Sequence, residues 1–263
     1  MQLQLKNLQH LNFSLNILCH LVLGYILITG TWVDIVCALL IYAFIGMNEQ
    51  SFYHRLYTHK SWDCPQWLKA VGLHIAALSL LAPVIPWVSL HREHHRFFDT
   101  EKDPHSPLYM PRAQVQFKSS YFHFNTRYGL DLMRDKFCKF YTVYYFEVIF
   151  ATWALIFLLF GLHGLLVWMA GTSISILSAN TINSITHGSQ NWIWQYQLYR
   201  VNDTDTSQND LLLGYLGFDG WHNNHHAKPG KYYYGDRWWE IDLVGIYIWF
   251  LATVTGYKNS LVK

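Results

Sequence analysis

Charged side chains and paired cysteines are scarce in this 263-residue chain. Only 36 residues are Asp, Glu, Lys or Arg and the formal net charge is +2, which argues against an ordinary soluble surface and against nucleic acid as a partner. The four cysteines show no CxxC or other paired spacing, so we expect free thiols rather than disulfides or metal ligands. No small-residue cleavage site follows the first apolar run, so we expect no cleavable signal peptide.

Long apolar stretches are present instead. Four of them approach the ~20 residues that a transmembrane helix needs, at approximately 11–29, 32–50, 141–160 and 162–182, and the short turns TGTW and FGLHG join them into two hairpins. Lys and Arg are absent from residues 7–46 and 140–199, so the positive-inside rule places both termini and the regions 51–140 and 183–263 in the cytoplasm. We therefore expect one all-α integral membrane domain over residues 1–263, with four transmembrane helices and a cytoplasmic helical cap.

Two further apolar stretches are less suited to spanning. The stretch 67–90 contains Pro83 and Pro86 and would place the charged connector on the wrong side, so we expect an interfacial or re-entrant helix. The stretch 241–256 is short and is expected to be a docked amphipathic helix, with a fifth span as the alternative.

Histidine is the abundant polar residue, with fifteen copies gathered largely into clusters. In HxxHH the three imidazoles share one face of a helix, whereas the two of HxxxxH diverge by roughly 140° on a regular helix and would flank a site or lie at a helix end. At this histidine frequency about 0.05 HxxHH matches are expected by chance, and two are present. The clustered residues are His54 and His59 in HRLYTH, His91, His94 and His95 in HREHH, and His222, His225 and His226 in HNNHH.

All three clusters fall on the predicted cytoplasmic side. The fourth apolar stretch ends in NTINSITHG, which places His187 at the same level, with Asn183 on the same helical face. A single zinc ion uses about four ligands, whereas imidazole also suits iron and two irons can share nine. For His105 the sequence leaves the role open, and the remaining histidines are expected to be packed or interfacial: His10, His20, His74, His123 and His163.

Together, HRLYTH, HREHH, NSITH and WHNNHH resemble the histidine boxes of the membrane-bound fatty acyl desaturases, including the stearoyl-CoA and acyl-lipid delta-9 members. FFDTEKDPHSP after the second box, DTSQN before the third and RWWEIDL near the C-terminus also fit this family. The resemblance implies that the nine histidines, helped by Asn183, hold two iron ions. It further implies O2 as the co-substrate and a cis double bond in a fatty acyl chain as the product.

The same resemblance implies an acyl tunnel. In the animal acyl-CoA members a Trp matching Trp87 helps to bend the tunnel, and polar residues line the bend where this chain has Leu81 and Ala179. Chain length in that subgroup is limited at places matching Tyr42 and Gly46. This chain departs from the family pattern in NEQSFY before the first box and in GFDGWH where GEGWH is usual, so fine specificity does not transfer.

Neighbouring carboxylates are expected to orient the imidazoles by accepting their free N–H groups, and Asp103 and Asp219 are the candidates near the clusters. The chain has no HPGG segment of the cytochrome b5 type and no CxxC iron–sulfur motif, so electrons must come from a separate ferredoxin or cytochrome b5-type protein. Its short N-terminal arm favours a bacterial inner membrane over the endoplasmic reticulum.

The motifs leave several alternatives open. The acyl group can be carried by CoA, by an acyl carrier protein or by a membrane lipid. A lipid hydroxylase or acetylenase would use the same di-iron core. A membrane zinc hydrolase, a haem-binding carrier and a transporter-like role without metal chemistry are alternatives from other classes.

Overall fold

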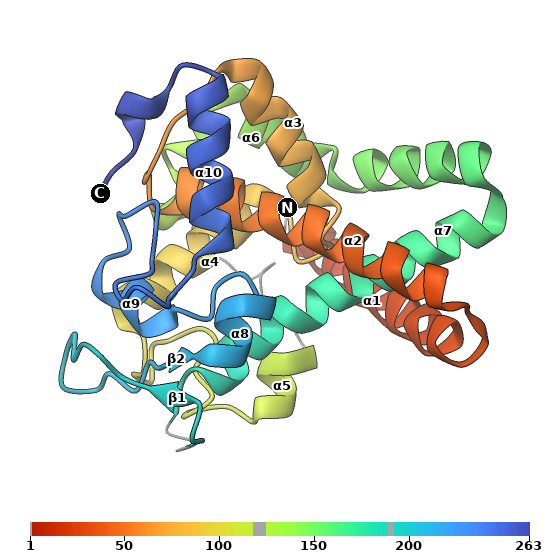
Figure 1. The fold of residues 1–263 in the computed structure, drawn as a ribbon. Coiled ribbons are helices and arrows are strands. Elements are labelled where there is room, and N and C mark those ends of the chain that lie inside the picture. Colours follow the sequence, from red (N-terminus) through yellow and green to blue (C-terminus); the bar gives the residue numbers. More distant parts are fainter. Residues whose placement is uncertain (1, 118–124, 189–191) are drawn as a thin grey trace.

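The computed structural model describes residues 2–117, 125–188 and 192–263. Most of the described chain is helical, and the long helices α1 (Gln2–Thr29), α2 (Trp32–Asn48) and α7 (Tyr145–Ile185) project together from one side of the molecule (Figure 1). Helix α2 begins at a capping box, in which Thr31 and Asp34 satisfy each other's backbone N–H groups. Because α7 packs against both α1 and α2, the three helices form one projecting bundle.

Among the described residues, three helices are long and apolar enough to cross a membrane: Leu8–Thr29, Trp32–Thr58 and Tyr145–Ile185. The last is interrupted at Gly161, which has φ 68° and ψ −171°, a conformation that glycine adopts without steric cost. Figure 1 shows α7 reversing direction along its length, so its two parts lie on either side of this break. The break falls at the predicted turn between 160 and 162. The approximate start at 141 falls in the preceding helix α6 (Lys136–Val143), and α7 begins at Tyr145.

The remaining described elements form a second region beside the bundle (Figure 1). They are η1 (Glu49–Thr58), α3 (Gln66–Ala77), α4 (Val84–Phe97), α5 (Arg112–Phe117), η2 (Thr126–Gly129), η3 (Leu132–Arg134), α6, β1 (Gln195–Tyr196), β2 (Asn209–Asp210), α8 (Leu211–Leu216), α9 (His222–Ala227), α10 (Leu243–Val254) and η4 (Lys258–Ser260). The all-α prediction needs one correction, since β1 and β2 pair in antiparallel register and bring the segment after α7 beside the segment before α8.

The two apolar stretches that were not predicted to span the membrane form shorter helices. Residues 67–90 form parts of α3 and α4 rather than one helix, because Leu80 takes φ 55° and Pro83 caps the second helix. Helix α10 has twelve residues and packs against η1, as predicted for a docked helix. It is not amphipathic, however, because its outward side chains Ile246, Trp249 and Phe250 are apolar.

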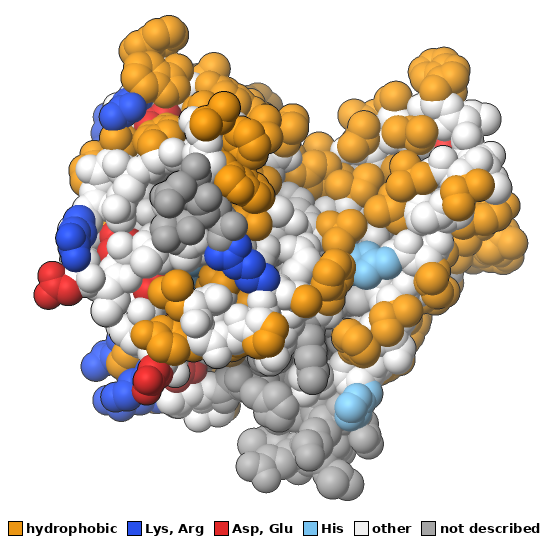
Figure 2. Space-filling model, turned by 90° about the horizontal axis from the view of Figure 1, so that it is seen from below, with side chains coloured by type: hydrophobic (Ala, Val, Ile, Leu, Met, Phe, Trp, Pro, Cys, Tyr) orange, Lys and Arg blue, Asp and Glu red, His pale blue; other side chains and the backbone are white. Residues whose placement is uncertain are grey.

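The two regions distribute apolar and polar side chains in opposite ways. The projecting helices expose large apolar side chains, such as Ile28 at 85% and Leu158 at 78% exposure. Figure 2 shows hydrophobic side chains spread over these helices, while Lys and Arg lie on the other region. That other region has an apolar core of its own, and beside it histidines and carboxylates are buried together. Apolar outside and polar inside is the arrangement expected when lipid solvates the helices and a polar site lies beside them.

Candidate metal centre

The first histidine pair lies on a π-helix. In η1 the backbone bonds run from residue i to i+5, and the His59 N–H donates to the His54 carbonyl at 3.1 Å. Two residues five apart therefore share one face, and the His54 and His59 rings are 4.8 Å apart between centroids. The predicted divergence of about 140° was wrong because it assumed a regular α-helix. The alternative expectation of a helix end is confirmed for His59, which caps η1.

The other clusters lie on short α-helices, as the HxxHH spacing predicts. The second cluster is on α4 and the third on α9, each with its three imidazoles on one helical face. His187 follows the end of α7 by two residues, after the cap residue Thr186. Four separate elements thus contribute the nine histidines.

The nine histidines form two groups. Within each group, one candidate ligand atom from each residue lies within 4.8 Å of all the others. All nine are buried except His59 and His95, which are half-buried. Group one is His54, His59, His91, His95 and His225, and group two is His94, His187, His222 and His226.

The outward nitrogen of several imidazoles meets a hydrogen-bond acceptor. Asp103 accepts from His94 Nδ1 at 3.0 Å, and Asp219 accepts from His222 Nδ1 at 3.3 Å and lies 3.4 Å from His225 Nδ1. Both carboxylates were predicted, and each lies beside the cluster expected of it. An acceptor here leaves Nε2 free to bind a metal ion and sets the orientation of the ring.

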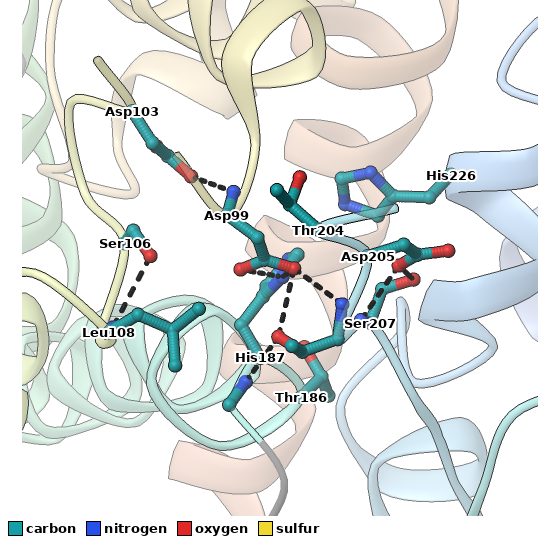
Figure 3. Close-up of polar contacts among 12 residues, drawn as sticks. Asp99, Asp103, Ser106, Leu108, Thr186, His187, Thr204, Asp205, Ser207 and His226 are labelled. Carbon is teal, nitrogen blue, oxygen red and sulfur yellow. Dashed lines mark hydrogen bonds and ion pairs between the residues drawn. The ribbon is translucent and has the colours of Figure 1, made fainter. Parts of the chain in front are cut away.

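Two further acceptors were not predicted. Asp99 accepts from His187 Nδ1 at 3.1 Å, and Gln50 accepts from His54 Nδ1 at 2.6 Å. Figure 3 shows the Asp99 carboxylate directed at His187. The same carboxylate also accepts from the backbone N–H of Thr206 at 2.8 Å. The only sequence signal for Asp99 was its place beside the HREHH box, which it shared with Asp103.

The Nε2 atoms face one another across each group. In group one, His225 Nε2 lies 3.0 Å from His54 Nε2 and 3.1 Å from His59 Nε2. In group two, His222 Nε2 lies 2.9 Å from His187 Nε2 and 3.1 Å from His226 Nε2. His187 and His222 both donate through Nδ1 to carboxylates, so in its neutral form each presents a lone pair at Nε2. Two lone pairs that face each other at 2.9 Å favour a positive charge between them.

Protons do not supply that charge for most of these residues at neutral pH. Burial and neighbouring imidazoles hold the pKa values of His91, His95 and His226 well below the usual range. Burial also lowers the pKa of His222 to about 4, despite its hydrogen bond to Asp219. His187 is the exception, because Asp99 raises its pKa by more than burial lowers it. Neutral imidazoles with converging Nε2 atoms fit a metal ion in each group.

Two carboxylates, Asp99 and Asp219, provide negative charge that would compensate the charge of a bound metal ion. Burial opposes ionisation of Asp99, but hydrogen bonds from His187 and Thr206 outweigh it and lower its pKa to about 2. Burial likewise opposes ionisation of Asp219, whose pKa is held well below the usual range by His225 and His54. These two carboxylates are therefore negatively charged at neutral pH.

A small cavity of about 20 Å³ lies beside group one. Its volume suits roughly one water molecule. Of the predicted tunnel residues, Leu81, Trp87 and Ala179 line it, and the Trp87 ring stacks on His91 at 5.0 Å. The predicted ligand helper Asn183 lines the same cavity and donates to the Ala179 carbonyl at 3.5 Å. The other lining residues are Gln50, His54, His91, Ile182 and Asp219.

Tyr42 and Gly46 are not among the residues that line this cavity. They lie against Phe218, whose ring centroid is 5.1 Å from that of Tyr42. His105, left open by the sequence, stacks on His94 with 4.2 Å between ring centroids. All four cysteines are free, as predicted.

Of the histidines outside the two groups, the structure describes all but His123. His20 and His74 pair with hydroxyl groups of α7, from Ser173 and Thr152 respectively. His163 pairs with Asp34 at 2.8 Å, at the start of α2. His123 lies outside the described residues.

A sequence model of the fatty acid desaturase family matches residues 30–244, a range that contains all nine histidines. The chain belongs to the fatty acid desaturase family. This desaturase-family chain is 32% identical over 241 residues to the delta-9 acyl-lipid desaturase 1 of Arabidopsis thaliana, covering 85% of this chain and 74% of the relative. It is 30% identical over 243 residues to the sn-1 stearoyl-lipid 9-desaturase of a Synechocystis strain, covering 87% and 72% respectively. The resemblance drawn from the histidine boxes is thereby confirmed.

Family membership and geometry agree on the class of chemistry. The relatives support fatty acid desaturation, and the two histidine groups can hold metal ions. A zinc hydrolase, a haem carrier and a structural transporter have no support from these relatives.

Proposed function

We propose that this chain is an O2-dependent di-iron desaturase that introduces a cis double bond into a fatty acyl chain. The observation that carries the proposal is the division of nine imidazoles into two groups with converging Nε2 atoms. Group one would hold one iron ion and group two the other, with Asn183 assisting from the cavity beside group one. Bound iron would supply the oxidising power that no amino-acid side chain has toward an unactivated methylene.

The protein residues orient the ligands and exclude water. Asp99, Asp103 and Asp219 accept from the outward nitrogens and keep the inward nitrogens free of protons. Burial of the histidines keeps bulk water from the site, which matters because water would quench or redirect a strong oxidant. The apolar side chains of Leu81 and Trp87 would hold methylenes beside His54 and His91.

The proposed reaction balances with an external electron donor. The acyl chain loses two hydrogen atoms from neighbouring carbons, and O2 is reduced to two water molecules by those atoms, two protons and two electrons. A ferredoxin or a cytochrome b5-type protein would supply the electrons. Because the relatives named above are acyl-lipid desaturases, we propose a membrane lipid as the acyl carrier rather than CoA or an acyl carrier protein.

We further propose that α1, α2 and each part of α7 cross the membrane, and that η1 lies at the cytoplasmic end of α2. Both termini and the histidine-bearing region would then lie on the cytoplasmic side, where Lys and Arg gather. A bacterial inner membrane is the proposed location.

The decisive experiment compares a host that expresses this chain with the same host expressing His225→Ala, using mass spectrometry of total fatty acids. A cis-unsaturated species confined to the wild type is expected. A hydroxylated or acetylenic species would identify the alternative reactions instead. Full activity of a purified protein with less than one iron ion per chain would contradict the di-iron mechanism.

A further inference from the structure

A buried carboxyl group lies one residue before the side chain that accepts from His54. Glu49 is 2% exposed and Gln50 is 7% exposed, and both belong to NEQSFY, where this chain departs from the family pattern. Gln50 Nε2 donates to Glu49 Oε2 at 3.0 Å, whereas Glu49 Oε1 has no hydrogen-bond partner among the described residues. Because burial of a polar group without a partner costs free energy, a half-satisfied carboxyl beside a metal centre calls for an explanation.

The contact between these two side chains lies at a junction of helices. Adjacent side chains on a regular α-helix do not face each other, but Glu49 is the first residue of η1 and directly follows α2. At this junction the Glu49 carboxyl meets the amide nitrogen of Gln50, and the amide oxygen of Gln50 lies 2.6 Å from His54 Nδ1. Two successive hydrogen bonds thus connect Glu49 to group one.

The direction of these hydrogen bonds decides which nitrogen of His54 carries the proton. The oxygen and nitrogen ends of an amide have nearly the same shape, so the partners of Gln50 select its orientation. With its nitrogen held by Glu49, Gln50 offers its oxygen to His54, which then donates through Nδ1 and keeps a lone pair at Nε2. A reversed amide would offer a donor to Nδ1 and move the proton to His54 Nε2, which faces His225 at 3.0 Å. A proton on that nitrogen would oppose metal binding.

Asp219 does not replace Gln50 as the acceptor of His54. Its Oδ2 atom lies 4.0 Å from His54 Nδ1, which is too long for a hydrogen bond. The same oxygen lies 3.3 Å from His222 Nδ1 and 3.4 Å from His225 Nδ1. The orientation of the Gln50 amide is therefore decisive for His54.

We propose that Glu49 is a positioning residue that fixes the amide orientation of Gln50 and thereby keeps His54 Nε2 free to bind a metal ion. This inference rests on the proposed metal binding by group one, but not on the proposed reaction. A carboxyl offers an acceptor oxygen with or without its proton, so hydrogen-bond geometry rather than charge carries the effect. Glu49→Gln keeps an acceptor at this place, and Glu49→Met removes it.

Metal titration tests the inference directly. Purified metal-free protein in detergent is titrated with Co2+ against a competing chelator, and the absorption of bound Co2+ is recorded. Two binding steps are expected, one for each histidine group. In Glu49→Met one step should weaken roughly fivefold, which is less than the ~10-fold effect of losing a direct partner because Gln50 remains. Equal affinity of wild type and Glu49→Met, or equal weakening of both steps, would overturn the inference.

Two single variants are the controls for this titration. Glu49→Gln should restore the affinity that Glu49→Met loses, because an amide oxygen can also accept from Gln50. Glu147→Met makes the same substitution at an exposed glutamate in the first turn of α7 and should leave both steps unchanged. If Glu49→Gln binds Co2+ as weakly as Glu49→Met, an acceptor at residue 49 is not sufficient and the inference fails.

A double-mutant cycle separates amide orientation from a general disturbance of packing. In the Gln50→Glu background both terminal atoms of residue 50 are oxygens, so no orientation has to be fixed. Glu49→Met should therefore leave Co2+ affinity unchanged in that background, although it lowers the affinity of the wild type. A packing disturbance would lower the affinity in both backgrounds, and that result would contradict the proposed role of Glu49.

The wild type distinguishes failure of this inference from failure of the proposed function. If it binds Co2+ in two steps but makes no oxidised product in the host, the proposed reaction fails, while the double-mutant cycle still decides the role of Glu49. If it binds no Co2+, the proposed metal centre fails and this inference fails with it.

Discussion

The two histidine groups differ in what supports them. In group two, His94, His187 and His222 each direct Nδ1 at a carboxylate. In group one, Asp219 lies 3.4 Å from His225 Nδ1, whereas His54 donates to the neutral amide of Gln50, and two members are only half-buried. Group one also borders the cavity. Because a carboxylate partner makes an imidazole a more basic ligand, we expect group two to bind a metal ion more tightly than group one, which has the cavity beside it.

The largest expected effect is loss of one imidazole from either group. Each of three variants should abolish the unsaturated product and lower the amount of bound iron: His225→Ala, His187→Ala and His226→Ala. The reason is that every ligand contributes to the binding free energy of the metal ion. Fatty-acid analysis and iron content of purified protein measure this. His163→Ala is the matched control, since that side chain is 67% exposed and pairs with Asp34. Full activity in any of the three ligand variants would contradict the assignment.

A large effect on stability is expected when the buried ion pair that holds η1 in place is broken. The histidines of η1 and its cap belong to group one only. Arg55 and Asp242 are almost fully buried and form two hydrogen bonds at 2.6 and 3.0 Å. Asp242→Asn leaves the Arg55 charge without its counterion and should lower the free energy of unfolding by about 3–5 kcal/mol. Denaturant unfolding in detergent measures it. A loss below 1 kcal/mol would mean that this pair does not hold the π-helix.

A smaller effect, on metal affinity, is expected when a carboxylate that supports group two is replaced by an amide like the one that supports His54 in group one. Asp99→Asn replaces a carboxylate with the kind of amide that Gln50 provides, so metal affinity should fall about tenfold, at the low end of the range for such partners. Competition with a chelator measures the affinity of each variant. If Gln50→Ala weakens metal binding more than Asp99→Asn, then carboxylates are not what distinguishes the groups.

The smallest effect is expected at the outer surface of group one. Asp131 pairs with Lys60 at 3.1 Å and with Arg92 at 2.7 Å, and its side chain is 41% exposed. Asp131→Asn should lower the free energy of unfolding by about 1 kcal/mol or less and leave iron content unchanged, because solvent screens exposed ion pairs. Thermal unfolding and metal analysis on one preparation check both statements. Loss of iron would show that the surface pair helps to position His91.

Much of the site follows from local pattern. The spacing HxxHH places three imidazoles on one face of any α-helix, so α4 and α9 were predictable without knowledge of their neighbours. The pairing of Asp103 and Asp219 with nearby clusters was also predictable, because each lies within nine residues of the histidine it contacts.

Other features depended on contacts between distant segments. The π-helix of η1 was not predictable, because nothing in HRLYTH distinguishes it from a regular helix. Asp99 contacts His187, which lies 88 residues away along the chain, and takes φ 59° to do so. No local pattern could have selected it over its neighbours.

The sequence by itself determined the family, the nine histidines and the apolar stretches, because these depend on residue identity and on spacing within single helices. Only the tertiary structure decided how the histidines divide between two groups, which acceptors support each group, and that Phe218 occupies the space above Gly46. Those features arise where η1, α4, α7 and α9 pack together. Packing between remote segments is set by the shape and polarity of both partners at once, which a linear pattern does not contain.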